Sequence, residues 1–341
     1  MSDALGVAVV GYGYWGPNLA RNIVANEDFQ LRWVCDRDAG RLASAGRLYP
    51  GTKTTGNLDE VLADPAVTLV AIATPVSTHA TLAQAALEAG KHVLVEKPLA
   101  MNEAEATALV ALARRQGRQI FVDHTFVFTP AVRKMKELLD SGELGQPLYY
   151  DSQRINLGLF QRDVDVIWDL APHDLSILDF LFNGALPASL TCVGAAHFGL
   201  SAANLAYLTL RYSNDVIAHV AANWLAPVKI RQILLCGDRR MVVYDDISVT
   251  EKIRVYDRGV AVKPPSERFE LLVQYREGDM FSPRVLPTEA LKIEFEHIAR
   301  VLREQEKAIV DGEAGLRVVK LLTMASQSMA GSGAVVELAS R

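Results

Sequence analysis

The segment from Val7 to Gly16 reads V-A-V-V-G-Y-G-Y-W-G and constrains the fold of this chain more than any other stretch. Four apolar residues run directly into glycines spaced G-x-G-x-x-G. The first glycine permits a tight turn after a buried strand, the second leaves room for a pyrophosphate, and the third lets the next helix pack closely. Free N–H groups at the start of that helix favour a phosphate. The segment therefore predicts a dinucleotide-binding turn whose candidate contacts are Gly11, Tyr12, Gly13, Tyr14, Trp15 and Gly16.

The residues after the glycine turn agree with this interpretation. A short helix is predicted over residues 18–26 and an apolar strand over Leu31–Cys35, which ends at Asp36. An acid about 20 residues after the last glycine accepts hydrogen bonds from the adenosine ribose hydroxyls. Because a carboxylate repels a 2′-phosphate, Asp36 favours NAD, whereas the neighbouring Arg37 is suited to pair with the extra phosphate of NADP. We expect NAD, and NADP stays open, as does a glycine turn without a ligand.

The bulk composition limits the classes of function. The 341 residues are enough for two domains, and half of them are hydrophobic. A net charge of −5 lacks the basic footprint of a nucleic-acid binder. No apolar run approaches the roughly 20 residues that span a bilayer, and no basic leader precedes the first strand, so we expect a cytoplasmic protein. Three distant cysteines indicate small buried hydrophobes, and the seven histidines show no zinc spacing, so no metal site is expected.

The first part of the chain, residues 1–122, alternates short apolar runs with helical stretches. This alternation predicts an α/β domain with a doubly wound parallel sheet, that is, a Rossmann domain. Gly90 and Gly117 are predicted to end two of its helices. The predicted strands are Val7–Val10, Leu31–Cys35, Thr68–Ile72, His92–Val95 and Gln119–Val122, and the predicted helices after the first are Leu58–Ala63, Thr81–Ala89 and Glu103–Arg115.

The second part, residues 123–341, contains mostly successive strand-like runs with few helical segments. This pattern predicts an α+β domain with a large open, mainly antiparallel sheet. Helices are expected over Ala131–Leu139 and Val166–Leu181 on one face of this sheet. The other face is expected to form a homodimer or homotetramer, unless loops or the final helices cover it. The closing helices, expected over Glu289–Asp311 and Gly315–Met329, are able to pack back on the first domain. The expected strands are Leu148–Ile155, Ser189–Ala196, Leu205–Tyr212, Val216–Asn223, Gln232–Cys236, Arg240–Tyr244 and Lys252–Tyr256, with Arg268–Tyr275 and Phe281–Val285 as further candidates.

Two motifs follow predicted strands of the first domain. A-T-P-V-S-T-H spans residues 73–79, and V-L-V-E-K-P spans residues 93–98. Ligands of open α/β sheets bind at the carboxyl ends of the strands, so Lys97 is expected near the nicotinamide. The bond between Lys97 and Pro98 is a candidate cis peptide. The alternative for this turn is a surface ion pair at a bend.

The third motif, I-W-D-L-A-P-H-D, spans residues 167–174 of the second domain. Asp169 and His173 are four residues apart and share one face of a helix. A histidine oriented by a carboxylate is a suitable acid–base group for interconverting an alcohol and a carbonyl. The alternatives are a helix histidine with a structural partner for His173 and a helix N-cap for Asp169.

Together these motifs resemble the Gfo/Idh/MocA oxidoreductases, which include glucose–fructose oxidoreductase, inositol dehydrogenase and nucleotide-sugar dehydrogenases. G-Y-G-Y-W-G, A-T-P-V-S-T-H, E-K-P and D-L-A-P-H-D occur in the family's order across essentially the whole chain. The resemblance implies that Lys97 hydrogen-bonds the reacting oxygen, that His173 is the catalytic base, and that Asp169 contacts substrate and orients this base. It also implies a cofactor cleft at Thr74, Pro75, His79, Glu96 and Lys97.

The resemblance implies a sugar substrate, and its nucleotide-sugar branch fits the G-Y-G-Y-W-G-P-N opening best. Two alternatives stay open: a cyclitol dehydrogenase of the inositol type, and a regulator that senses the dinucleotide without catalysis. Candidate substrate residues near the catalytic helix are Arg154, Asn156, Arg162 and Trp168. Either arginine is suited to a phosphate or carboxylate, the alternative being a surface cation. Asp123 departs from the family, which often has a small residue at this position.

Overall fold

The structure is a computed structural model that describes residues 4–158, 164–262 and 273–338. The chain folds into two compact units, which are described separately. The first unit comprises residues 1–129 and 288–323, and the second comprises residues 130–287 and 324–341. Residues 288–323 therefore return to the N-terminal unit, an arrangement that the sequence left open.

The first unit is built on a six-stranded sheet of order β3-β2-β1-β4-β5-β6. Each pair is parallel, and this order is that of the doubly wound dinucleotide-binding fold. The strand order reverses between β1 and β4, which is the topological switch point where ligands of such sheets bind. The strands are β1 (Leu5–Val10), β2 (Phe29–Cys35), β3 (Lys53–Thr55), β4 (Leu69–Ile72), β5 (His92–Glu96) and β6 (Ile120–Asp123).

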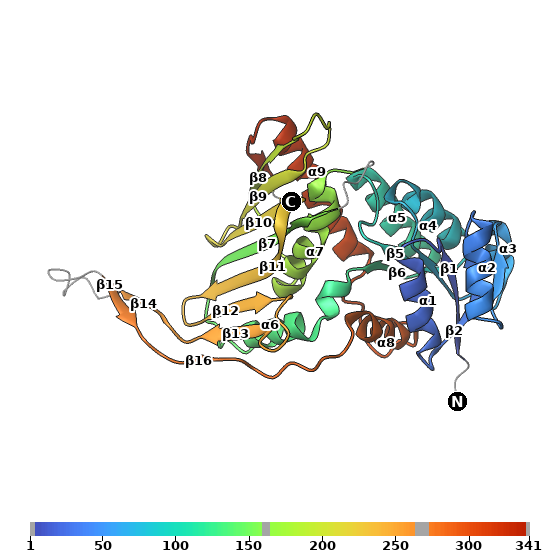
Figure 1. Ribbon diagram of the computed structural model, residues 1–341, viewed down its shortest axis with the longest axis horizontal. Helices are drawn as coiled ribbons and strands as arrows, with labels where there is room; N and C mark the ends of the chain where they lie inside the picture. Colours follow the sequence, from blue (N-terminus) through green and yellow to red (C-terminus); the bar gives the residue numbers. More distant parts are fainter. Residues whose placement is uncertain (1–3, 159–163, 263–272, 339–341) are drawn as a thin grey trace. The chain divides into compact units, whose positions relative to one another are not determined.

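Helices of the first unit cover both faces of this sheet (Figure 1). On one face, Leu19 and Ile23 of α1 pack with Phe295 and Ile298 of α8 in the same buried cluster as β1 residues. These apolar side chains recur at helical spacing, which explains why both helices bury one stripe. The helices are α1 (Gly16–Val24), α2 (Ala39–Leu48), α3 (Leu58–Ala63), α4 (His79–Glu88), α5 (Glu103–Gln116) and α8 (Ala290–Leu302), with short 3-10 turns η1 (Val76–Thr78) and η2 (Thr125–Phe128).

Helix α8 ends earlier than the sequence suggested, so the prediction of a helix over Glu289–Asp311 is wrong in its second half. Glu304 has a φ of 58°, a left-handed conformation that a helix does not accommodate. Beyond it, the carbonyl of Val310 accepts a hydrogen bond from the N–H of Val122. Helix α9 (Gly312–Ala330) follows, and its first glycines pack against Ile120 and Val122 of β6.

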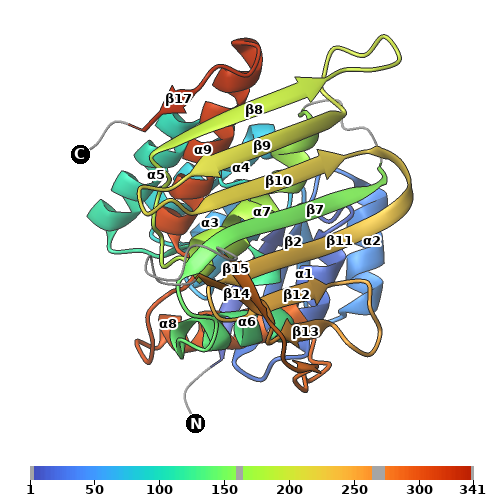
Figure 2. The ribbon, with the colours of Figure 1, turned by 90° about the vertical axis from the view of Figure 1, so that its left-hand side faces the viewer.

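The second unit contains a nine-stranded sheet of order β16-β13-β12-β11-β7-β10-β9-β8-β17. Neighbouring strands are antiparallel except for β7 and β10, so the predicted mainly antiparallel sheet is confirmed. Figure 2 shows these strands in one layer with α6 (Pro130–Asp140) and α7 (Val166–Leu181) behind them. The strands are β7 (Pro147–Leu157), β8 (Ser189–Ala195), β9 (Leu205–Arg211), β10 (Ile217–Asn223), β11 (Leu225–Gly237), β12 (Met241–Asp245), β13 (Ile253–Tyr256), β16 (Met280–Phe281) and β17 (Val336–Glu337).

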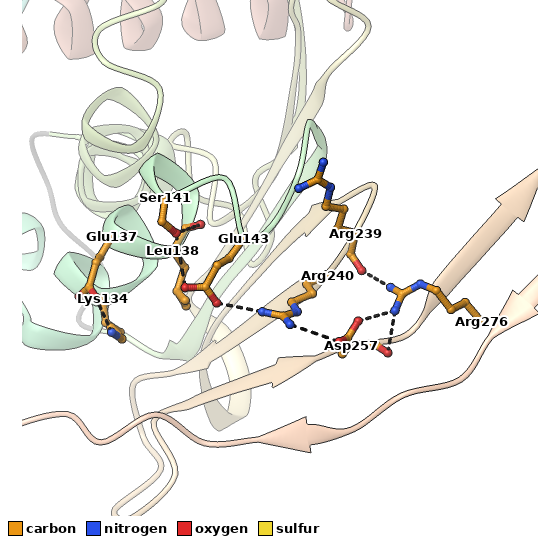
Figure 3. A network of polar contacts seen from close by, with 9 residues as sticks. All are labelled: Lys134, Glu137, Leu138, Ser141, Glu143, Arg239, Arg240, Asp257 and Arg276. Atoms are coloured by element: carbon orange, nitrogen blue, oxygen red, sulfur yellow. Dashed lines mark hydrogen bonds and ion pairs between the residues drawn. The ribbon is translucent and has the colours of Figure 1, made fainter.

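A small separate sheet joins β14 (Gly259–Val262) to β15 (Val273–Arg276). An ion-pair network fixes its base to the large sheet (Figure 3). Arg240 pairs with Glu143 at 2.9 Å and with Asp257 at 3.3 Å, and Arg276 also pairs with Asp257. Because an isolated two-stranded hairpin is only marginally stable, we infer that these ion pairs help to stabilise the β14–β15 sheet.

Within the described residues, no helix is long and apolar enough to cross a membrane. The three cysteines carry free thiols; Cys35 and Cys192 are buried and Cys236 is half-buried. Burial raises the pKa of the Cys35 thiol to about 11, which fits the expectation that these residues pack as small hydrophobes.

Candidate functional site

The glycine turn after β1 has the geometry that its spacing predicts. Gly11 has a φ of 91°, and a Cβ there would lie 2.6 Å from the carbonyl oxygen of Ala73. A Cβ on Gly16 would lie 2.0 Å from the carbonyl oxygen of Gly11. By contrast, a Cβ on Gly13 would meet nothing nearer than the Arg41 side chain at 3.6 Å. Two glycines thus permit backbone packing, and the third keeps the mouth of the turn open.

A cavity of about 680 Å³ lies at the carboxyl ends of β1, β2 and β4 in the first unit. Its size and position fit a dinucleotide, and the open face of the glycine turn supplies a backbone cradle for phosphate. Nine of the predicted cofactor residues line it: Gly11, Gly13, Tyr14, Trp15, Asp36, Arg37, Thr74, Pro75 and Glu96. Tyr12, Gly16, His79 and Lys97 are not among its lining residues.

Asp36 follows β2 directly and is fixed by backbone donors. Its Oδ2 accepts a hydrogen bond of 2.6 Å from the N–H of Tyr12, and its Oδ1 accepts one of 2.8 Å from the N–H of Asp38. The carboxylate is therefore oriented at the cavity wall before any ligand arrives. Tyr12 contributes this backbone contact, while its ring is buried at 5% exposure.

Arg41 is a cavity residue that the sequence did not single out. It lies in the first turn of α2, and its guanidinium is 3.5 Å from Asp36. Side chains in the first helical turn after β2 point toward the edge of the sheet at which β2 ends. This position was the sequence signal that could have identified Arg41. Two arginines, Arg37 and Arg41, therefore line the wall beside one carboxylate.

Lys97 follows β5 at the same edge of the sheet, and its bond to Pro98 is cis. His79 supports this turn from behind, because its Nδ1 lies 2.8 Å from the carbonyl oxygen of Pro98 and its Nε2 lies 2.8 Å from that of Thr74. Burial lowers the pKa of His79, which is 1% exposed. The side chain of His79 thus connects the loop that contains Thr74 to the loop that contains Pro98.

In the second unit, the predicted acid–base pair, Asp169 and His173, lies on α7. This helix covers the predicted range, and its N-cap is Asp165, whose side chain accepts from the N–H groups of Ile167 and Trp168. The alternative of Asp169 as the N-cap is therefore excluded. Asp169 lies one turn before His173 and accepts a hydrogen bond of 3.1 Å from the indole of Trp224.

Arg154, a predicted substrate residue, is held inside the second unit by an acidic partner. Arg154 is 4% exposed, and its guanidinium donates hydrogen bonds of 2.7 and 3.3 Å to the two carboxylate oxygens of Asp174. It lies on the helix-facing side of β7, where alternation places every second residue in the core. Trp168 donates to Ser326 and is half-buried, as is Asn156, whereas Arg162 lies outside the described residues.

The comparisons with known proteins agree with this geometry. A profile described as "Oxidoreductase family, NAD-binding Rossmann fold" matches residues 5–124, and the GFO/IDH/MocA C-terminal domain matches residues 132–244. The chain belongs to the Gfo/Idh/MocA family of oxidoreductases. The expected family, its two-sheet fold and its NAD cofactor are thereby confirmed, and the alternative of a regulator without catalysis is set aside.

Individual relatives place the chain within this family. UDP-N-acetylglucosamine 3-dehydrogenase of Acidithiobacillus ferrooxidans is 29% identical over 91% of this chain and 93% of its own. Its crystal structure superposes with a TM-score of 0.82 at 25% identity over 97% and 99% of the two chains. A putative oxidoreductase from Magnetospirillum magnetotacticum has a TM-score of 0.80 at 30% identity over 94% and 99%. The scyllo-inositol 2-dehydrogenase (NAD(+)) of Bacillus subtilis is 30% identical over 54% and 56%.

Proposed function

We propose that this protein interconverts a secondary alcohol and a ketone on the sugar ring of a UDP-sugar, with NAD as the hydride carrier. The observation that carries the proposal is the position of Asp36, whose carboxylate is held in the cofactor cavity by the N–H of Tyr12. The same chain also contains the E-K-P and D-x-x-x-H motifs. The nearly full-length similarity to UDP-N-acetylglucosamine 3-dehydrogenase supports a nucleotide sugar and oxidation at C3.

The residue roles in this proposal follow the family resemblance. Bound NAD⁺ supplies the acceptor for the hydride that leaves the substrate carbon. The imidazole of His173 takes the hydroxyl proton, and the ammonium of Lys97 stabilises the oxygen on which negative charge develops. Asp169, held by the indole of Trp224, orients His173 and contacts the substrate. The ketone, the reduced cofactor and one proton are the balanced products.

A cyclitol substrate is the second candidate. It is favoured by the similarity to scyllo-inositol 2-dehydrogenase (NAD(+)), which covers only about half of either chain. Arg154 offers no preference between the two, because its charge is neutralised inside the second unit by Asp174.

The test is the absorbance of reduced nicotinamide when the protein is mixed with NAD⁺ or NADP⁺ and a panel of UDP-sugars, free sugars and inositols. Turnover with UDP-N-acetylglucosamine or a related UDP-sugar, and none with inositols, is the expected result. Turnover with inositols alone would replace the proposed substrate by the second candidate.

The proposal includes self-association through the open face of the nine-stranded sheet. Val193, Tyr207 and Ile217 on three adjacent strands of this face are 51%, 44% and 39% exposed. A patch of this kind on a large sheet is suited to a symmetric dimer. Sedimentation of the native chain should give a homodimer or homotetramer, and Ile217→Lys should shift it toward the monomer.

A further inference from the structure

Helix α7 contains a proline between the two members of the predicted acid–base pair. Pro172 lies inside the helix, three residues after Asp169 and directly before His173. Proline has no N–H, so the helix lacks the hydrogen bond that residue 172 would otherwise donate to the carbonyl of Trp168. Sharp bends in helices occur mainly where such a bond is missing. The relative orientation of Asp169 and His173 therefore needs support from contacts on each side of Pro172.

The part of α7 before Pro172 is held by a buried tryptophan. The carboxylate of Asp169 accepts a hydrogen bond of 3.1 Å from the indole of Trp224, which is 2% exposed. The backbone of Trp224 is hydrogen-bonded to Asn204 and to Gly158, and a Cβ on Gly158 would lie 2.5 Å from the indole ring. The indole thus has little room to move, and it fixes the position of Asp169.

The part of α7 after Pro172 is held by strand β7. Arg154 donates from Nε and Nη2 to the two carboxylate oxygens of Asp174, at 2.7 and 3.3 Å. From the same face of β7, the hydroxyl of Tyr150 donates a hydrogen bond of 3.3 Å to the carbonyl of Asp174. All three residues are buried. Two side chains of one strand thus hold the residue that directly follows His173.

The chemistry of the Arg154–Asp174 pair indicates a role in orientation. Charges removed from water are costly, and apolar residues of similar volume often stabilise a core equally well. A guanidinium that donates two parallel hydrogen bonds fixes the plane of the carboxylate, which neither an apolar contact nor an ammonium does. Adjacent residues of a helix point about 100° apart, so fixing Asp174 in the core also fixes the direction of half-buried His173.

We propose that Arg154 is a positioning residue that, through Asp174, fixes the orientation of His173 relative to Asp169. This role rests on the proposed functions of His173 and Asp169 and is independent of the sugar. Arg154 is buried in the second unit and acts without touching the substrate. Its replacement should therefore slow proton transfer and leave the binding of substrate and of NAD largely unchanged.

The first test is Arg154→Lys, which keeps a cation beside Asp174 and removes the paired hydrogen bonds. We expect kcat to fall about 10- to 100-fold, because a displacement of roughly 1 Å at a catalytic group has an effect of this size. The KM for UDP-N-acetylglucosamine and the Kd for NAD should stay within about twofold of the native values. Arg240→Lys is the matched control, because its carboxylate partners, Glu143 and Asp257, lie outside α7.

Two kinetic results would overturn the proposal. A higher KM with an unchanged kcat would show that Arg154 binds the substrate instead. Native values of both constants would show that the paired hydrogen bonds of Arg154 have no influence on His173.

The second test needs no substrate, so it separates a failure of this proposal from a failure of the proposed function. NMR resonances of the His173 imidazole and of the Trp224 indole N–H report on the two parts of α7, and His173→Gln and Trp224→Phe assign them. In Arg154→Lys, the His173 resonances should move while the Trp224 resonance stays in place. Movement of neither would overturn the proposal, and movement of both would show a general structural role instead.

The double variant Arg154→Met/Asp174→Leu gives the same comparison if Arg154→Lys does not fold. It leaves no unpaired charge in the core, so we expect it to fold with a urea midpoint near the native one. Its kcat should still be reduced, because apolar side chains do not fix the direction of His173. A native kcat in this stable variant would show that the pair serves packing alone and would overturn the proposal.

Discussion

The backbone N–H of Tyr12 donates a hydrogen bond of 2.6 Å to Oδ2 of Asp36, which joins the glycine turn to the end of the neighbouring strand. This bond fixes the acid at the cavity wall and leaves its remaining acceptor capacity for a ligand. Arg37 and Arg41 line the same wall, so we expect the balance between binding ribose hydroxyls and binding a 2′-phosphate to depend on Asp36.

Asp36→Ala should therefore weaken NAD binding far more than NADP binding. The variant removes a charge-assisted acceptor and leaves two arginines, so the ratio of the two dissociation constants should shift by about 10- to 100-fold toward NADP. Fluorescence titration with both cofactors measures the ratio, with Asp59→Ala as the control. An unchanged ratio would remove Asp36 from the cofactor assignment.

Lys97→Met should abolish turnover and retain the cofactor. Loss of one charged donor to a developing oxyanion costs roughly 10²- to 10³-fold in kcat, while the NAD cavity keeps its lining residues. Steady-state kinetics and a binding titration on the same preparation separate the two effects. Lys53→Met, at a largely exposed lysine of the same unit, is the control. If turnover and NAD affinity fall together, the lysine has a structural role.

The buried pair of Arg154 and Asp174 should matter for stability. Arg154→Met leaves the Asp174 carboxylate in the core without its guanidinium, which costs about 3–5 kcal/mol in the free energy of unfolding. Urea unfolding measures this loss. The double variant Arg154→Met/Asp174→Leu should recover most of it, because no charge is then left unpaired. Exposed Arg239→Met is the control, and an equal loss there would contradict the explanation.

The pH dependence of stability should report the protonation of Glu294. Because burial and Asp123 raise its folded pKa above the ordinary 4.5, the folded chain holds a proton that the unfolded chain releases. Stability from this group is therefore complete below pH 4.5 and declines as the pH rises toward the folded pKa. Urea unfolding between about pH 5 and pH 8 measures this decline. The free energy of unfolding of Glu294→Gln should rise relative to that of the native chain as the pH increases across this range. A constant difference across this range would show that Glu294 is ionised in the fold.

The sequence predicted the elements whose patterns are local. The glycine turn, helix α7 with its stated bounds, and every parallel strand of the first unit except β3 follow from apolar spacing and glycine positions. Strand β3 (Lys53–Thr55) was missed because it is short, polar and largely exposed. Helix α2 (Ala39–Leu48) was missed because its small residues give only a weak apolar stripe.

The contacts at the site that the sequence did not reveal are non-local. Arg154 looks like a binding residue until β7 pairs with its neighbours and turns it toward Asp174, 20 positions away. The contact of Asp123 with Trp15 joins residues 108 positions apart, and Glu294 enters only because α8 returns to the first unit. Periodicity carries no information about such pairs, and the sequence therefore left the role of Asp123 open.

The most direct measurement follows the hydrogen itself. The protein is mixed with NAD⁺ and UDP-N-acetylglucosamine that carries deuterium at C3, and the reduced cofactor is examined by mass spectrometry. The proposed function predicts NADH that contains the deuterium, and no labelled NADH with Lys97→Met. Unlabelled NADH would contradict hydride transfer from C3, and an absence of NADH across UDP-sugars would contradict the proposed substrate class.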